Sequence, residues 1–194
     1  MIAYLKGNFV HKTPSSVIVD VQGIGYEVHI SLNTYSAIQS SDKGLLFTHL
    51  LIKEDAHLLY GFADQKEKET FLALLGVSGI GAGTARLILS YMKPDEVVSA
   101  IVMGNSSALE KIKGIGKKTA ERAILELRDK MGKLPPGTTI SVQSGGSTIR
   151  QDALEALYAL GINKVQAEQT LNKVLVAEPG IELETLIKRV LKSL

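Results

Sequence analysis

VSGIGAGTA (residues 77–85) and IKGIGKKTA (residues 112–120) are two near-copies of one short motif, offset by 35 residues. In each copy a Gly-Ile-Gly triplet separates two helical patterns, so the chain turns tightly and leaves main-chain N–H groups uncovered where the second helix begins. These amides, together with the positive end of a helix dipole, make an anion-binding site that needs no particular side chain. The repeat therefore predicts contacts to phosphates and DNA binding that does not read the bases.

The context of the two copies indicates a duplicated unit. A single Gly-x-Gly would indicate only a tight turn or a helix C-cap, but two copies between matched helical patterns favour a repeat. Ala85 and Ala120 stand at the same offset in each copy, and a small residue there lets the second helix pack closely on the first. Pro94 is predicted to begin a separate linking helix, with Asp95 and Glu96 in its first turn.

The composition bounds the class of protein. A chain of 194 residues with 45% hydrophobic residues, a net charge of +2 and no Cys predicts a soluble protein of one to three small domains, without disulfides, thiolate nucleophiles or zinc fingers. The sequence has no signal-peptide core and no apolar run long enough to span a membrane, so we expect a cytoplasmic protein without membrane contact. Residues 111–133 hold eight Lys or Arg against three Asp or Glu. This basic stretch surrounds the second motif copy, although a solvated helix face is the alternative interpretation.

Residues 1–62 predict a small β-barrel. An OB-type barrel fits the number and length of the strands, and an SH3-like barrel also fits them. The aromatic residues mostly occupy strand positions that should face a core, which disfavours a single-strand-binding module that stacks bases on them. The four His residues build no ligand cluster and are interpreted as structural or surface residues. The expected strands lie near Ile2–Lys6, Val17–Val21, Gly25–Ile30, Leu45–Ile52 and His57–Phe62, and the aromatic residues are Tyr4, Phe9, Tyr26, Tyr35, Phe47, Tyr60 and Phe62.

The C-terminal part reads as a linker followed by a small helical domain. Residues 132–148 are rich in Pro, Gly and Ser and lack periodicity. Helices are predicted over Ile149–Leu160, closed by Gly161, and near Lys164–Val176 and Leu183–Leu194. Such a short three-helix bundle buries little surface, so it can offer apolar positions to a partner or serve as a capping domain without one.

Longer sequence matches point to a known family. The two motif copies resemble the tandem helix-hairpin-helix domains that bind duplex DNA. KEDAHLLYGF (residues 53–62) and GIGYEV (residues 23–28), followed by the two Gly-Ile-Gly copies, closely resemble the RuvA family of bacterial Holliday-junction branch-migration subunits. The resemblance covers essentially the whole chain and implies a multidomain α+β protein. Its expected parts are an OB-fold β-barrel (1–63), a tandem helix-hairpin-helix domain (64–132), a flexible linker (133–148) and a three-helix partner-binding domain (149–194).

The resemblance also implies a function. Members of this family bind four-way DNA junctions as a homotetramer or octamer and recruit the hexameric ATPase motor RuvB for branch migration in recombination and repair, and the junction resolvase RuvC is a further expected partner. Glu54 and Asp55 match the family's acidic pin. Four such pins near the crossover would repel wrongly placed phosphates and help keep strands apart. No cofactor, metal or catalytic residue is implied.

Candidate contact residues follow from both arguments. Lys117 and Lys118 reinforce the second amide site, whereas Ala82 and Gly83 stand at the matching positions of the first. The expected DNA-binding residues are Gly79, Ile80, Gly81, Gly83, Thr84, Arg86, Lys113, Gly114, Ile115, Gly116, Lys117, Lys118, Thr119 and Arg122, with Lys93 as a further helper. The partner-binding candidates are Leu154, Leu157, Tyr158 and Leu160.

An enzymatic interpretation is the main alternative. Helix-hairpin-helix glycosylases and nucleases use a Lys near the hairpin with a downstream Asp. Here the pairing would be Lys117 or Lys118 with Asp129, which stand about 16 Å apart along one predicted helix. The chain also lacks the Gly-x-x-x-x-Gly-Lys-Ser/Thr nucleotide-binding motif, so motor activity is expected to come from a partner.

Overall fold

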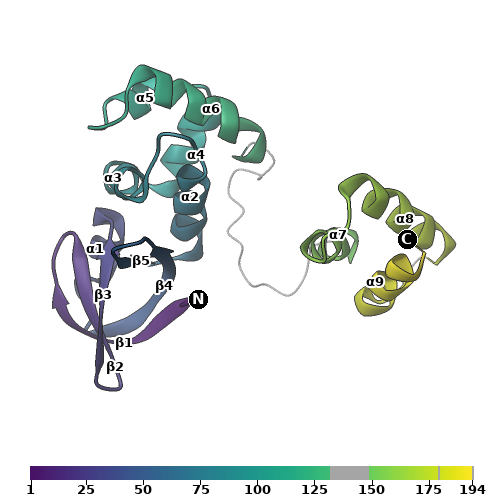
Figure 1. The fold of residues 1–194 in the computed structure, drawn as a ribbon, viewed down its shortest axis with the longest axis horizontal. Coiled ribbons are helices and arrows are strands. Elements are labelled where there is room, and N and C mark those ends of the chain that lie inside the picture. Colours follow the sequence, from purple (N-terminus) through teal and green to yellow (C-terminus); the bar gives the residue numbers. More distant parts are fainter. Residues whose placement is uncertain (132–148, 179, 194) are drawn as a thin grey trace. The chain divides into compact units, whose positions relative to one another are not determined.

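The computed structural model describes residues 1–131, 149–178 and 180–193. The chain divides into two compact units, Met1–Thr139 and Ile140–Leu194 (Figure 1). The predicted linker, residues 132–148, lies outside the described residues.

The first unit begins with a closed five-stranded barrel. Its strand order is β1-β2-β3-β5-β4, in which every hydrogen-bonded neighbour is antiparallel except the parallel pair β3–β5. Insertion of the fifth strand between the third and the fourth makes the Greek-key arrangement of an OB-type barrel, as predicted. The strands are β1 (Tyr4–Lys12), β2 (Ser16–Val21), β3 (Ile24–Ile30), β4 (Lys43–Ile52) and β5 (His57–Phe62).

Two elements of the barrel differ from the sequence prediction. β1 begins at Tyr4 and continues to Lys12, because a bulge between Phe9 and His11 shifts the register and lets pairing with β2 continue where the alternation breaks. The short helix α1 (Leu32–Ile38) was not predicted. Its N-cap Ser31 accepts the Thr34 N–H at 3.0 Å. Seven residues are too few to display a helical period.

The aromatic residues mostly face a core, as predicted, although Tyr4 and Tyr35 differ from the expectation. Phe9, Tyr60 and Phe62 are buried as expected. Tyr4, at the first position of β1, is 58% exposed, and Tyr35 lies on α1 rather than on a strand. The strand period gives the face of a residue but not whether another element covers that face.

Five helices complete the described part of the first unit and share a core with the barrel. The ring of Phe71 on α2 lies 5.2 Å from the ring of Tyr60 and 4.9 Å from that of Phe62, so α2 packs directly on β5. Ala85 and Ala120 are fully buried, as their small size predicts. The helices are α2 (Gln65–Leu75), α3 (Ala82–Tyr91), α4 (Pro94–Val102), α5 (Ser106–Glu110) and α6 (Lys117–Met131).

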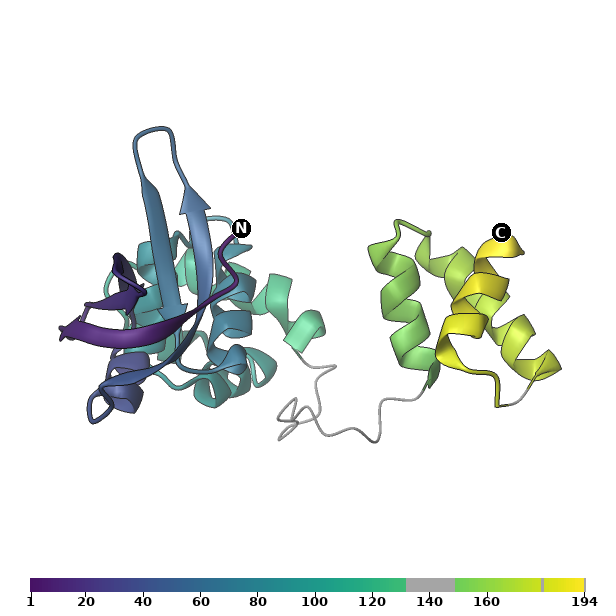
Figure 2. The ribbon, with the colours of Figure 1, turned by 90° about the horizontal axis from the view of Figure 1, so that it is seen from below.

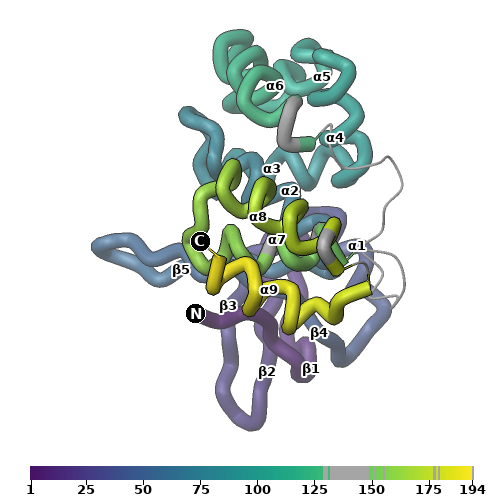
Figure 3. Tube along the Cα trace, turned by 90° about the vertical axis from the view of Figure 1, so that its right-hand side faces the viewer, coloured from purple at the N-terminus to yellow at the C-terminus, as the bar shows by residue number. Residues whose placement is uncertain are grey.

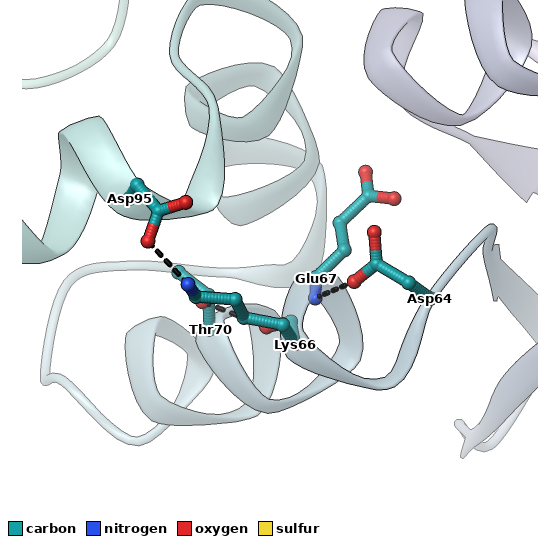
Figure 4. Close-up of polar contacts among 5 residues, drawn as sticks. All are labelled: Asp64, Lys66, Glu67, Thr70 and Asp95. Carbon is teal, nitrogen blue, oxygen red and sulfur yellow. Dashed lines mark hydrogen bonds and ion pairs between the residues drawn. The ribbon is translucent and has the colours of Figure 1, made fainter. Parts of the chain in front are cut away.

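Polar contacts hold α2 in place at its N-terminus. Asp64 caps the helix by accepting the Glu67 N–H at 2.7 Å, and Lys66 forms an ion pair with Asp95 on α4 (Figure 4). Asp95 and Glu96 occupy the first turn of α4 behind Pro94, as predicted. The Lys66–Asp95 pair is partly solvated, so it orients the two helices more than it stabilises them.

The second unit is the predicted three-helix bundle, formed by α7 (Ile149–Ala159), α8 (Lys164–Ala177) and α9 (Leu183–Lys192). Gly161, with a φ of +83°, ends the first of these helices as expected. The core contains Ala153, Leu154, Leu157, Ala167, Leu171, Leu186 and Val190.

Candidate nucleic-acid interface

The two Gly-Ile-Gly turns have the same backbone geometry. Gly79 and Gly114 both have a φ of +93°, a conformation that suits glycine because it has no Cβ. The Ile80 N–H donates to the Val77 carbonyl at 3.0 Å, and the Ile115 N–H donates to the Ile112 carbonyl at the same distance. The turns are therefore two copies of one structure.

Buried isoleucines anchor both turns. Ile80 is 4% exposed and Ile115 is 6% exposed, and both side chains belong to the unit's shared core. Their burial leaves the flanking glycines at the surface. The apolar residue of each triplet thus fixes the turn from inside while the polar backbone faces outward.

The turns lie close together. A Cβ placed on Gly79 would be 3.7 Å from both Cγ2 and Oγ1 of Thr119, so the first turn stands beside the first turn of α6. Gly81 caps α3, and among the described residues no side chain forms a cap hydrogen bond there. The first-turn amides of α3 remain available to an anion next to the start of α6.

The two copies differ in their charged side chains. In the second copy Lys113, Lys117 and Lys118 are all exposed. In the first copy the positions that match Lys117 and Lys118 hold Ala82, which is buried, and Gly83. The first site must therefore rely on main-chain donors, whereas the second adds formal positive charge.

The remaining hairpin candidates have contacts of their own. Arg86 donates from Nη1 to the Ser15 carbonyl at 2.9 Å and so ties α3 to the barrel turn between β1 and β2. Arg122 lies 3.9 Å from Glu126, measured from Nε to Oε1, on the exposed side of α6. Thr84 and Thr119 are half-buried, and Lys93 is the exposed N-cap residue of α4.

A second feature of the surface is the ribbon formed by β4 and β5, which projects from the rest of the first unit (Figures 2 and 3). Its turn is closed by the Lys53 N–H, which donates to the Ala56 carbonyl at 2.8 Å. Glu54 and Asp55 are both exposed at this turn. The projecting tip therefore carries two adjacent negative charges.

A buried polar network joins the barrel to the helices. Glu67 on α2 is 2% exposed, and its carboxylate accepts hydrogen bonds from the hydroxyls of Ser31 and Thr34, the second at 2.5 Å. The Thr34 hydroxyl in turn accepts the Ala63 N–H at 3.1 Å. Burial raises the pKa of Glu67 above its usual value, and the two hydroxyl hydrogen bonds oppose that shift. The network sets α2, and with it the hairpins, against the barrel.

His49 lies at the same junction. Its ring is 6.0 Å from that of Phe71, and its buried Nδ1 has no hydrogen-bond partner within the described residues. Burial lowers the pKa of His49, and the charge of Lys68 lowers it further. The structure gives this imidazole a packing role, which agrees with its interpretation as structural.

The described residues contain no group of three or more His, Cys, Asp or Glu that could hold a metal ion. Lys117, Lys118 and Asp129 all lie on α6, which extends as one helix from Lys117 to Met131. The separation along one helix that disfavours a lysine-aspartate catalytic pair therefore applies to this chain.

The four partner-binding candidates of the second unit differ in how deeply their side chains are buried. Leu154 and Leu157 belong to the bundle core, and the half-buried Tyr158 donates from its hydroxyl to Glu168 at 3.1 Å. Leu160 is 61% exposed. Of the four, Leu160 has the most exposed side chain, and Tyr158 is partly exposed.

Comparison with known proteins covers both units. The family model described as RuvA N terminal domain matches residues 1–61, the SAM-like Helix-hairpin-helix tandem model matches 71–129, and the RuvA, C-terminal domain model matches 148–194. The chain is 45% identical to a protein of Flavobacterium psychrophilum over 194 residues, covering 100% of both chains. It is 47% identical to one of Cytophaga hutchinsonii over 197 residues, covering 99% of both. Each relative is named Holliday junction branch migration complex subunit RuvA.

The chain belongs to the RuvA family. A third relative of that name, from Amoebophilus asiaticus, is 47% identical over 196 residues and is also covered completely. The RuvA family models thus account for the barrel with its ribbon and for the three-helix bundle, and the helix-hairpin-helix model accounts for the two turns.

Sequence reasoning missed Glu67 and Ser31, which position the site of this RuvA family member, and did not foresee that the candidate Arg86 contacts Ser15. The buried carboxylate of Glu67, its partner Ser31 and the Arg86 contact to Ser15 join segments more than 30 residues apart. Ser31 carried a helix-cap signal, but nothing local marked Glu67 as buried in an otherwise polar helix. No helix among the residues that the structure describes is long and apolar enough to cross a membrane.

Proposed function

We propose that this chain binds four-way (Holliday) DNA junctions by their structure rather than their sequence, and that it is the DNA-binding subunit of a branch-migration complex. Membership of the RuvA family supports this function. The observation that carries it is the pair of matched turns, Gly79–Gly81 and Gly114–Gly116, set side by side on one unit.

The two turns would hold one duplex through its phosphates. Main-chain amides at each turn and helix start donate to a phosphate oxygen without distinguishing bases. Lys117 and Lys118 add charge at the second turn, so the second hairpin carries more of the salt-dependent affinity. Binding is therefore independent of the base sequence and depends on the path of the DNA backbone.

The exposed carboxylates Glu54 and Asp55 would act as separators near the crossover. Negative charge on a projecting ribbon repels phosphates that approach it, so duplex is disfavoured there and an opened junction is tolerated. Their role in this proposal is electrostatic, and the subunit acts as the non-catalytic part of the complex.

Partners complete the proposed assembly. A homotetramer, or an octamer of two face-to-face tetramers, would present hairpins to four DNA arms, and the hexameric ATPase RuvB would drive branch migration, with RuvC as a further partner. Exposed apolar side chains in the second unit, Leu160, Val165 and Val176, support a partner contact. A cytoplasmic location and domain boundaries at 1–63, 64–132, 133–148 and 149–194 belong to the same proposal, and the matched ranges support these boundaries.

Competition between DNA structures tests the proposal. The purified protein is titrated against a labelled four-way junction and against linear duplex built from the same arm sequences, without magnesium. A symmetric assembly that engages several arms should prefer the junction by about a hundredfold. Lys117→Ala with Lys118→Ala should remove most of this affinity.

A charge-matched variant controls for the removal of the two lysines. Lys164→Ala with Lys173→Ala removes the same charge from the second unit and should bind the junction as the wild type does. Equal wild-type affinity for junction and duplex would reduce the protein to a general duplex binder and contradict the proposal.

A further inference from the structure

The β4–β5 ribbon extends past the barrel by three cross-strand pairs. In the strand register, β1 reaches β4 as far as Phe47, and β3 reaches β5 at Tyr60 and Gly61. The pairs Leu50–Leu59, Leu51–Leu58 and Ile52–His57 have no third strand paired beside them within the described residues. A two-stranded ribbon of this kind depends on packing of its faces for stability.

The side chains on the ribbon differ in burial along its length and between its two faces. Leu50 and Leu59 pack into the barrel core, and Leu51 and Leu58 pack against the core that α2 shares. Because side chains alternate along a strand, Ile52 and His57 continue the face of Leu50 and Leu59. This next pair has left the core, with Ile52 65% exposed and His57 also exposed.

The exposed pair lies directly below the acidic turn. Ile52 precedes the turn and His57 follows it, while Glu54 and Asp55 stand at its tip. The carboxylates disfavour a phosphate at this end of the ribbon. A nucleobase carries no formal charge and has a flat, largely apolar face, which can lie against isoleucine methyl groups or stack on an imidazole ring.

Resting on the junction binding proposed above, we propose that Ile52 and His57 form a base-contacting surface on the projecting ribbon. The acidic tip excludes phosphates, and the pair below it contacts bases that have lost their stacking partners at the crossover. The ribbon therefore has two roles. Its tip repels the DNA backbone, and its flank, formed by Ile52 and His57, retains bases.

A fluorescent base reports on this contact. The full-length protein is titrated against a four-way junction with 2-aminopurine at the crossover, whose emission rises when the base leaves the stack. Wild type should raise the emission, and Ile52→Ala and His57→Ala should each diminish that rise. Ile52→Ala should weaken junction binding by about fivefold, because less apolar surface is buried against the base, and leave binding to linear duplex unchanged.

Matched variants separate the contact from a structural effect. Ile24→Ala removes an isoleucine of similar exposure, 60%, from the hairpin between β2 and β3 and should match the wild type in emission and affinity. Ile52→Val keeps a branched apolar side chain and should retain most of the emission change. Thermal unfolding of each variant shows whether the fold is intact.

Three results would overturn the inference in distinguishable ways. If Ile52→Ala equals the wild type in emission and junction affinity, the bases do not touch this face although junction binding stands. If light scattering shows that Ile52→Ala changes the mass of the assembly, the residue packs between copies of the chain. If the wild type itself does not prefer the junction, the proposed function fails and the inference with it.

Discussion

At the scale of single residues, backbone geometry sets the hairpins apart from an ordinary turn. Gly79 and Gly114 share a φ of +93°, and neither would meet a serious clash if a Cβ were added, since Thr119 lies 3.7 Å from that of Gly79. A side chain at either position would therefore lower stability because of the left-handed backbone conformation and not because of a clash with neighbouring atoms. This distinction allows stability and DNA binding to be separated by substitution.

Gly114→Ala is expected to lower the free energy of unfolding by about 1–2 kcal/mol, the cost of the left-handed conformation, and to weaken junction binding. Gly104, with a φ of +72° between α4 and α5, offers the matched control. Gly104→Ala should lose similar stability in urea unfolding but keep the wild-type affinity. Equal loss of affinity in both variants would show that stability alone governs binding.

Glu67 makes stability depend on pH. The pKa of Glu67 is raised in the folded state, so the folded protein binds the proton of this carboxyl more tightly than the unfolded chain does. The resulting contribution to the free energy of unfolding is fully present below the unfolded pKa of 4.5 and is lost as pH rises through the folded-state pKa. Glu67→Gln removes this titration and should flatten the dependence of the unfolding free energy on pH over the acidic range. Urea unfolding at a series of pH values measures it.

Glu69→Gln on the same helix is the control for Glu67, since Glu69 is exposed. It should keep the wild-type dependence on pH. An unchanged dependence in Glu67→Gln would mean that the buried carboxyl does not bind its proton differently in the folded and unfolded states.

At the scale of elements, the two hairpins attract phosphates and the tip of the β4–β5 ribbon repels them. Uncovered amides lie at the turns before α3 and α6, and three exposed lysines stand at the second of these turns, whereas the ribbon tip holds Glu54 and Asp55. Opposite charges on separate elements favour a ligand whose phosphates approach one element and avoid the other.

Glu54→Gln with Asp55→Asn is therefore expected to raise the affinity for linear duplex more than the affinity for the junction, so that the ratio between them falls. The reason is loss of repulsion at the tip. Titrations at low salt, where screening is weak, measure the ratio. Glu27→Gln with Asp42→Asn neutralises two carboxylates elsewhere on the barrel and should leave the ratio unchanged; a fall there as well would indicate a general charge effect.

At the scale of the whole molecule, the proposed assembly combines the phosphate contacts of several subunits, each of which is weak alone. If four subunits each neutralise at least two phosphates, the slope of log K against log salt should be on the order of −7. Lys117→Ala with Lys118→Ala should reduce the magnitude of this slope by roughly half or more. Junction titrations over a salt series measure it, and a wild-type slope near −2, as expected for about two phosphates, would indicate that one subunit binds alone.

Local sequence patterns were enough to define the secondary-structure elements and the family. The strands, the two turns and the three-helix bundle were predicted because alternation, helical period and glycine punctuation act within a few residues of chain, and duplication made the turns conspicuous. Motifs such as KEDAHLLYGF linked the chain to the RuvA family without any knowledge of its packing.

Which residues of those elements come into contact depends on the tertiary structure. It set Gly79 beside Thr119, placed Arg86 on the Ser15 carbonyl, buried Glu67, and left Ile52 and Leu160 exposed while Leu157 entered a core. These outcomes depend on close packing between segments distant in the chain, which decides burial and contact one side chain at a time. A local pattern specifies the face of a helix or strand, and the neighbour that covers it comes from elsewhere in the fold.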